Sequence, residues 1–417
     1  MDSLKRKAYT WMRWSEKYTG TDMVYLAKGG FWLTIGQIVS SLSALTLSVA
    51  FANFIPKETY GTYKYILSVV GLVGMFSLTG MNLAVTQAIA RGLEGTLRKS
   101  FLVQLKWSII PLTISIVGGI YYLVQGNKIL ALSLLIAGLL NPISDSANTF
   151  LAFFGGKKMF GTQVKYNAIF FFFTTIIMLA TIFISGKVIW LIFIYFFSRF
   201  IINIFLYIKT LRSFTPNDVS DDKTIDYGKH LSLINIPTII ASNVDKILIF
   251  HSFGAAQLAI YTFAIALPEQ IKGVLKNIAV LALPKLSEKT KHDARRAITG
   301  KITRFLLLLV TLIVTYVILA PFLYKLLFPQ YLESVHYSQI FIISLLFTGL
   351  IIMFTNVLQS QIEIKSLYKF NIAGSIIQIL ILFFMITYCG ILGAVWARSI
   401  YGLLNLSYLW FLIKKNN

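Results

Sequence analysis

The chain of 417 residues is 57% hydrophobic and only 13% charged, and its mean hydropathy is +0.74. A soluble domain of this composition would expose apolar surface to water, so the sequence excludes a soluble protein and indicates an integral membrane protein. The formal net charge is +22, and a single Cys389 excludes an intramolecular disulfide and a cysteine-based metal or redox cluster.

Apolar runs recur along almost the whole chain, and each is long enough to cross a hydrocarbon core of roughly 30 Å as a helix of about 20 residues. The runs are continuous, so they predict helices and not the alternating strands of an outer-membrane barrel. Twelve spans are predicted, at residues 29–52, 63–88, 105–124, 129–153, 166–185, 188–208, 231–252, 258–283, 304–325, 335–358, 368–388 and 392–413. The predicted fold class is an all-α polytopic membrane protein with about twelve transmembrane helices.

Polar stretches divide the predicted spans into two halves. Residues 1–28 are polar, basic and interspersed with aromatic residues, which predicts a cytoplasmic amphipathic segment at the membrane surface. Residues 209–230 form the longest polar break and predict a cytoplasmic linker. It would join an N-lobe, residues 29–208, to a C-lobe, residues 231–413, each with six spans.

A short internal match suggests that the two lobes are repeats. Tyr63-Lys64-Tyr65 opens the second span, and Tyr261-Thr262-Phe263 lies at the start of the eighth, at an offset of 198 residues. An even number of spans separates the two segments, so both lobes have one orientation. Parallel repeats of this kind are related by an axis along the membrane normal and usually place a substrate path between them.

The distribution of Lys and Arg predicts the orientation, because cytoplasmic loops keep an excess of positive charge. With the N-terminus inside, the inside segments hold 27 of the 38 basic residues and the outside loops hold four. Both termini are therefore predicted to be cytoplasmic. The net positive charge is then mostly an orientation signal that faces anionic lipid, and it gives little support to nucleic-acid binding.

Seven basic residues remain within or at the edges of the spans, together with only three acids. A charge at the bilayer centre costs about 2.5–3.5 kcal/mol on insertion scales, so these side chains are expected to face protein or a wet cavity. The bases are Lys64, Lys106, Arg199, Lys246, Lys272, Lys276 and Arg398, and the acids are Asp145, Asp245 and Glu269.

Several of these charges also have a purely structural interpretation. Glu269 and Lys272 are three residues apart on one helical face and can pair with each other. Asp245 can compensate a basic residue of another helix. Arg199 and Arg398 have no acid in their own helices, so they need partners elsewhere or an anionic substrate.

Short segments in both halves form a recognisable pattern. They are Gly29-Gly30-Phe31-Trp32, Phe54 to Tyr63, Gly80-Met81-Asn82-Leu83-Ala84, Asn243 to Ile249, Ile260-Tyr261 and Leu283-Pro284-Lys285-Leu286. With these segments the chain resembles the Wzx-type polysaccharide (O-antigen or repeat-unit) flippases of the multidrug/oligosaccharidyl-lipid/polysaccharide exporter superfamily. The resemblance extends over nearly the full chain.

The resemblance implies a V-shaped pair of lobes in a bacterial cytoplasmic membrane, with the first, second, seventh and eighth spans lining a cavity that opens alternately to each side. It implies a substrate of oligosaccharide linked to undecaprenyl diphosphate. The other partners would be membrane lipids and further polysaccharide-assembly membrane proteins. A diphosphate carries about two negative charges and favours a cavity with excess Lys and Arg.

The candidate residues follow from this implication. The substrate-binding candidates are Lys64, Lys246, Lys272, Lys276, Arg199 and Arg398, and the ion-coupling candidates are Asp145, Asp245 and Glu269. The implied architecture places the four lysines in cavity-lining spans and the two arginines further from the centre. No catalytic residue, metal ligand or cofactor is predicted.

Other functions remain open. A cation-coupled multidrug exporter of the same superfamily would need buried acids, whereas bases outnumber acids in these spans. A membrane-bound polysaccharide polymerase or ligase would need a sizeable outside loop, and every predicted outside loop is short. The chain has no GxxxxGK[ST] phosphate loop, so ATP hydrolysis is not expected. A non-transporting scaffold fits the hydropathy but gives no reason for the intramembrane bases.

Overall fold

The computed structural model describes residues 23–287, 291–360 and 364–415, and these residues contain helices and no strand. The first half comprises α2 (Met23–Phe54), α3 (Lys57–Val73), η1 (Gly74–Phe76), α4 (Met81–Ala90), α5 (Thr96–Trp107), α6 (Ile109–Val124), α7 (Lys128–Ala147), α8 (Phe150–Gly156), α9 (Phe160–Ile184) and α10 (Val188–Phe214). The second half comprises α11 (Asp222–Ser287), α12 (Lys291–Leu327), η2 (Pro329–Tyr331), α13 (Ser334–Phe341), α14 (Ser344–Ser360) and α15 (Ile364–Lys415). Most of the predicted amphipathic segment, residues 1–22, lies outside the described residues.

Nine helical segments of the described chain are long and apolar enough to cross a membrane, and the bent pair of α3 and α4 adds a tenth. Two of the nine, within α11 and α15, are 54 and 42 residues long, whereas one crossing needs about 20 residues. α11 breaks at Gly254, with φ 86°, and α15 breaks at Gly390, with φ 60°. Counting each as two crossings raises the ten to twelve, the number that the sequence predicts.

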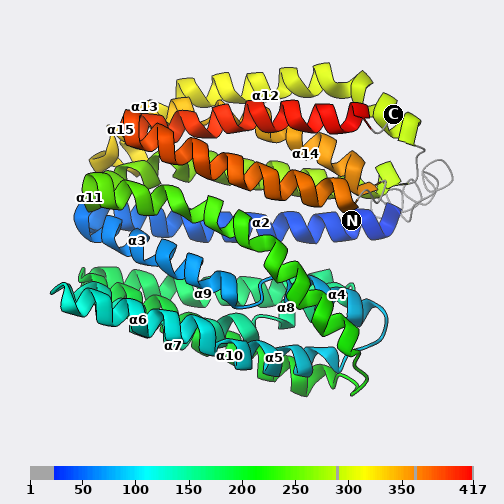
Figure 1. Cartoon of the computed structure of the whole chain (residues 1–417), viewed down its shortest axis with the longest axis horizontal. Coiled ribbons are helices and arrows are strands. Elements are labelled where there is room, and N and C mark those ends of the chain that lie inside the picture. The colour runs from blue at the N-terminus through cyan, green and yellow to red at the C-terminus, as the bar shows by residue number, and fades with distance from the viewer. Residues whose placement is uncertain (1–22, 288–290, 361–363, 416–417) are drawn as a thin grey trace, which may run out of the picture.

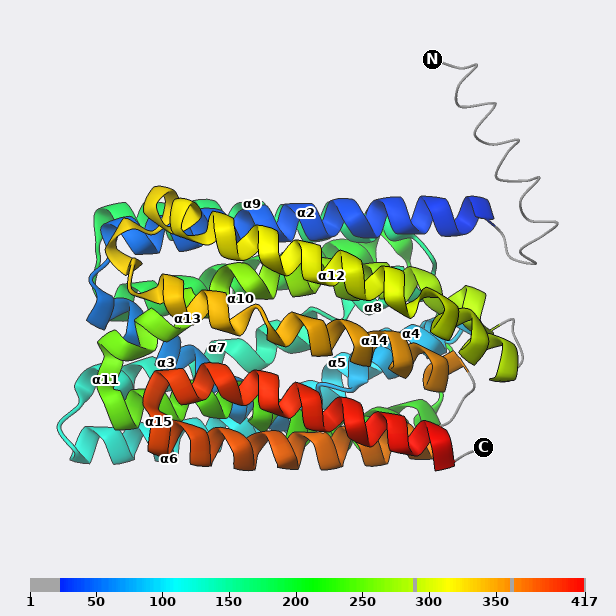
Figure 2. The same cartoon turned by 90° about the horizontal axis from the view of Figure 1, so that it is seen from above.

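Both breaks require glycine, because a side chain at these positive φ values would meet the backbone. They fall between the predicted seventh and eighth spans and between the predicted eleventh and twelfth. Figures 1 and 2 show α11 and α15 folding back at the same end of the bundle, which we call the turn end. We call the opposite end, where α2 begins and α15 ends, the terminal end; it is the end predicted to be cytoplasmic.

The second predicted span, residues 63–88, is not one straight helix. α3 and α4 meet at an angle of 54° across η1, and α3 begins at Lys57, before the predicted boundary. Lys64 therefore lies two turns inside a helix. The bend falls at Ser77-Leu78-Thr79-Gly80, a short segment between two apolar stretches.

The helices near the centre of the bundle join its two sides. Figure 1 shows α12 to α15 on one side, α5 to α10 on the other, and α2, α3 and α11 between them. α3 packs along the first arm of α11 and against the residues just after its break at Gly254, where small residues allow close approach. A Cβ atom on Gly61 would overlap the carbonyl oxygen of Ala255, and one on Gly71 would lie 2.9 Å from Oδ1 of Asn243.

The predicted linker at 209–230 is mostly helical, because α10 and α11 extend into it and leave only residues 215–221 outside helices. This short connection is attached to the first half. Arg98 Nη1 of α5 lies 2.7 Å from Asp218 Oδ1. The connection is therefore fixed to α5 along part of its length.

We expect Gly61→Ala to lower the melting temperature of the detergent-purified protein by several degrees, because the added methyl overlaps the α11 backbone and overpacking costs about 1–3 kcal/mol. Gly74→Ala is the matched control, since nothing lies within 4 Å of a Cβ atom there. Equal melting temperatures for the two variants would contradict the close α3–α11 packing.

Candidate functional site

A cavity of about 350 Å³ lies between the two halves. Its lining comes from α2, α3, the two arms of α11, Tyr195 of α10 and Phe328 after α12. The lining residues are Ala44, Leu45, Leu47, Ser48, Phe51, Tyr60, Tyr63, Lys64, Leu67, Tyr195, Lys246, Thr262, Ile265, Ala266, Leu267, Glu269, Gln270 and Phe328. Helices α2, α3 and α11 supply the first, second, seventh and eighth spans, which are the spans that the family resemblance implies.

Lys64 brings a positive charge from the first half into this cavity. Its Nζ lies 5.2 Å from the ring centre of Tyr60 and 5.9 Å from that of Tyr63. An ammonium group above aromatic rings is attracted by their negative faces. Within the described residues, no carboxylate oxygen lies within ion-pair distance of Lys64 Nζ. No carboxylate of the described chain therefore neutralises its charge.

Lys246 brings a second positive charge to the cavity from α11 in the second half. Its Nζ donates a hydrogen bond to the carbonyl oxygen of Ser242 at 3.0 Å and lies 3.9 Å from Asp245 Oδ1. The side chain is 22% exposed, so the ammonium group is accessible from the cavity.

Glu269 is the acid in the cavity lining. Lys272 Nζ donates to its Oε1 at 2.9 Å, the pairing that the three-residue spacing suggests. Lys272 itself is not among the lining residues, and the side chain of Lys276 lies outside the described part of the chain.

Asp245 takes part in a buried ion pair in the second half. Its side chain is completely buried, and its Oδ2 accepts hydrogen bonds from Arg398 Nη2 at 2.6 Å and from the Tyr261 hydroxyl at 2.7 Å. Arg398 thus has the partner on another helix that its position requires. Neither Asp245 nor Arg398 lines the cavity.

Arg199 and Asp145 lie in the first half, away from the cavity lining. The Arg199 guanidinium carbon lies 5.1 Å from the Phe170 ring centre and 5.2 Å from that of Tyr195. Asp145 Oδ2 accepts a hydrogen bond from Asn141 Nδ2 at 2.9 Å. Tyr195 does line the cavity, so the Tyr195 ring lies between the Arg199 guanidinium group and the cavity.

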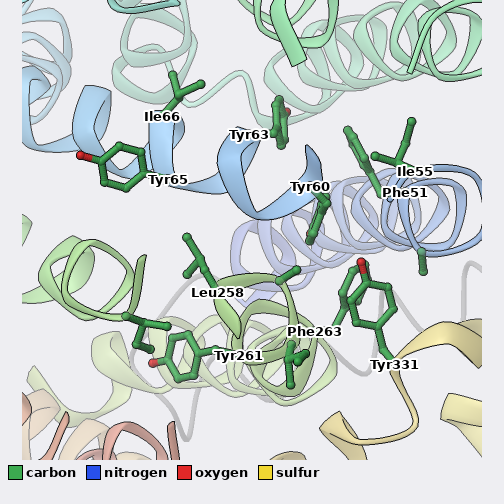
Figure 3. Close-up of a cluster of buried hydrophobic side chains, with 14 of the residues drawn as sticks. Phe51, Ile55, Tyr60, Tyr63, Tyr65, Ile66, Leu258, Tyr261, Phe263 and Tyr331 are labelled. Carbon is green, nitrogen blue, oxygen red and sulfur yellow. The ribbon is translucent and has the colours of Figure 1, made fainter. Parts of the chain in front are cut away.

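Packed aromatic rings close the cavity toward the turn end. Tyr60 stacks on Phe263 with ring centres 4.7 Å apart, and Phe263 lies 4.0 Å from Tyr331. Figure 3 shows Phe51, Tyr60, Phe263 and Tyr331 directed toward one another from α2, α3, α11 and η2. These rings come from both halves, so the two halves meet here.

Polar contacts between the halves surround these rings. Asn53 Nδ2 donates to the carbonyl oxygen of Leu327 at 3.1 Å, and Gln330 Nε2 donates to the carbonyl oxygen of Asn53 at 3.1 Å. Lys57 of α3 forms an ion pair with Glu333. We call the aromatic rings and these contacts the turn-end seal.

Sequence reasoning did not identify the cavity tyrosines Tyr60, Tyr63 and Tyr195 as site residues. A signal for two of them was present, because Tyr60, Tyr63 and Lys64 follow an i, i+3, i+4 spacing that places them on one helical face. Aromatic residues beside an intramembrane base can therefore be sought directly. Tyr195 carried the same signal, because it lies four residues before Arg199 on one helical face.

The comparisons with known proteins identify the family. The family model described as "Polysaccharide biosynthesis protein" matches residues 26–290. The chain belongs to the polysaccharide biosynthesis protein family. A search of curated protein sequences gives no significant match.

Solved structures of this fold include transporters. The lipid II flippase MurJ in an inward closed conformation has a TM-score of 0.69 and 16% identity, covering 91% of this chain and 87% of that chain. A multidrug resistance MATE family transporter of the MOP superfamily has a TM-score of 0.64 in its outward-facing conformation, with 12% identity over 94% of this chain and 96% of that chain. Its inward-facing conformation also gives 0.64, with 10% identity over 92% and 98%. The predicted fold class, an all-helical polytopic membrane protein, is confirmed.

We expect the turn-end seal to restrict access to Lys64. In a Cys389→Ser background, Lys64→Cys should react with a membrane-impermeant maleimide from the turn end far more slowly than Lys187→Cys, an exposed position before α10. Adding Asn53→Ala and Gln330→Ala should accelerate the reaction at position 64, because both hydrogen bonds across the seal are lost. Similar initial rates at positions 64 and 187 would contradict a closed turn end.

Proposed function

We propose that the chain is a flippase that moves undecaprenyl-diphosphate-linked oligosaccharide repeat units across a bacterial cytoplasmic membrane by alternating access. The supporting observation is that Lys64 and Lys246, from opposite halves, line one cavity in a member of the polysaccharide biosynthesis protein family. Two cations match the roughly two negative charges of a diphosphate. The solved flippase and multidrug transporter structures support the fold on which such a mechanism depends.

The lysine environments suit an anion that arrives and leaves. Two opposite unit charges 4 Å apart attract each other by about 4 kcal/mol at an effective dielectric constant near 20. Lys64 is held against aromatic rings, so no carboxylate among the described residues has to be displaced from it before an anion binds. Because binding is shared between two halves, separation of the halves weakens it and allows release.

The cavity volume limits what binds in this conformation. At about 350 Å³, it lies near the lower end of the roughly 300–1,000 Å³ typical of small-molecule sites. It accommodates the diphosphate head group, whereas several sugars require the halves to move apart. The polyprenyl tail would remain in the lipid.

The sealed turn end gives the proposed cycle a direction. The terminal end carries most of the basic residues and is predicted to be cytoplasmic. Substrate would enter from that side, and release would require the seal to break. Because residues 215–221 are attached to α5 through Asp218, we propose that this connection moves with the first half as the second half rocks.

Energy coupling would use a proton or sodium gradient, or substrate supply alone. Of the three candidate acids, Glu269 lines the cavity, whereas Asp245 is paired with Arg398 and Asp145 lies away from the lining. We therefore place Glu269 first among the coupling candidates.

We expect Lys64→Gln and Lys246→Gln each to reduce transport at least about tenfold, because a hydrogen bond to a charged group contributes roughly 1.5–3 kcal/mol and 1.4 kcal/mol is a factor of ten. The measurement is restoration of surface polysaccharide in bacterial strains that lack their own repeat-unit flippase, with several different sugars represented. Lys187→Gln is the control, since this exposed lysine lies outside the cavity.

All variants are compared at equal membrane abundance. Full restoration by the Lys64→Gln, Lys246→Gln double variant would contradict the cationic cavity. Failure of the unaltered chain in every strain, together with resistance to cationic dyes, would favour the multidrug exporter instead.

A further inference from the structure

The Asp245 carboxylate lies between two cations, of which one lines the cavity and the other does not. Arg398 Nη2 is 2.6 Å from Oδ2, and Lys246 Nζ is 3.9 Å from Oδ1. Arg398 does not line the cavity, whereas Lys246 does. One buried acid is thus shared unequally between a cation behind the cavity wall and a cation within it.

Two further hydrogen bonds satisfy the Asp245 carboxylate. Tyr261, from the second arm of α11, donates its hydroxyl to Oδ2 at 2.7 Å. The backbone N–H of Lys246 donates to Oδ1 at 2.9 Å. The carboxylate is therefore satisfied without the Lys246 ammonium group, which donates instead to the carbonyl oxygen of Ser242.

Loss of Arg398 would change this division. A completely buried carboxylate without a partner is costly, and the nearest available cation is Lys246 on its flexible four-carbon stem. The remaining separation of 3.9 Å can be closed by rotation of the lysine side chain. Lys246 would then be neutralised by Asp245, and the cavity would lose one of its two positive charges for binding an anion.

We propose that Arg398 is a positioning residue that occupies Asp245 and so leaves the charge of Lys246 available to the anionic head of the substrate. This inference rests on the proposed function, because it assigns the released charge to diphosphate binding. It gives Arg398 a role through Lys246 and not a direct contact with substrate.

A double-mutant cycle on anion affinity tests the proposal. The full chain is purified into lipid nanodiscs, and its affinity for inorganic pyrophosphate is measured by calorimetry. Arg398→Gln should weaken binding about tenfold in the unaltered background. In a Lys246→Gln background the same substitution should have no further effect, because the lysine through which it acts is absent. Arg398→Lys should retain much of the affinity, since it can still pair with Asp245.

Tyr261→Phe provides a milder variant that removes only one hydroxyl group. Without that hydrogen bond, Asp245 has more capacity to attract Lys246, so a two- to threefold weakening is expected, on the order of the lower range for a single hydrogen bond. This loss should also vanish in the Lys246→Gln background. The melting temperature and gel-filtration profile of each variant show that it is folded, and Tyr261→Phe carries the test if Arg398→Gln does not fold.

The outcomes separate this inference from the proposed function. One outcome is that the unaltered chain binds pyrophosphate while Arg398→Gln, or Tyr261→Phe, weakens binding equally in the unaltered and the Lys246→Gln backgrounds. That result would overturn the positioning role of Arg398 and leave the cationic cavity intact. No pyrophosphate binding by the unaltered chain would overturn the diphosphate part of the proposed function, and the inference with it.

Discussion

A charged side chain inside a bilayer is stable only where it meets an opposite charge, an aromatic face or water. Asp245 and Arg398 meet the first condition as a buried pair. Lys64 and Arg199 lie against aromatic rings, and the Lys246 ammonium group remains accessible in the cavity. The Asp245–Arg398 pair thus holds helices together, whereas the ammonium groups of Lys64 and Lys246 remain available to bind an anion in the cavity. These two ammonium groups define the candidate site.

Helix packing places the available charges opposite each other. The close approach of α3 to α11 at Gly61 brings a first-half helix and a second-half helix together, and Lys64 and Lys246 extend from these two helices into one cavity. The turn-end seal closes the same cavity toward the turn end with aromatic rings from both halves. Any motion that parts the halves therefore changes the seal and the separation of the two cations together, which is the coupling that alternating access requires.

The spans could be predicted because hydropathy registers each crossing, and the polar residues around Gly254 and Gly390 mark the two sharp turns. The bend between α3 and α4 was not predicted, although Ser77, Thr79 and Gly80 lie at it, because the apolar residues on both sides keep the two helices together apolar enough for one span. Sequence reasoning recognised that Arg398 needs a partner on another helix, but its pairing with Asp245 depends on which helices meet, and one sequence holds little information on that. The family resemblance set the lysines apart from Arg199 and Arg398, which do not line the cavity, but it could not separate Lys64 and Lys246 from Lys272, which is also not among the lining residues.

The most direct test of this account is a cryo-electron microscopy structure of the protein in nanodiscs with an undecaprenyl-diphosphate-linked sugar. We expect density for the diphosphate between Lys64 and Lys246, with phosphate oxygens within ion-pair distance of both Nζ atoms. A head group bound elsewhere, with the two lysines still facing an unoccupied cavity, would contradict it.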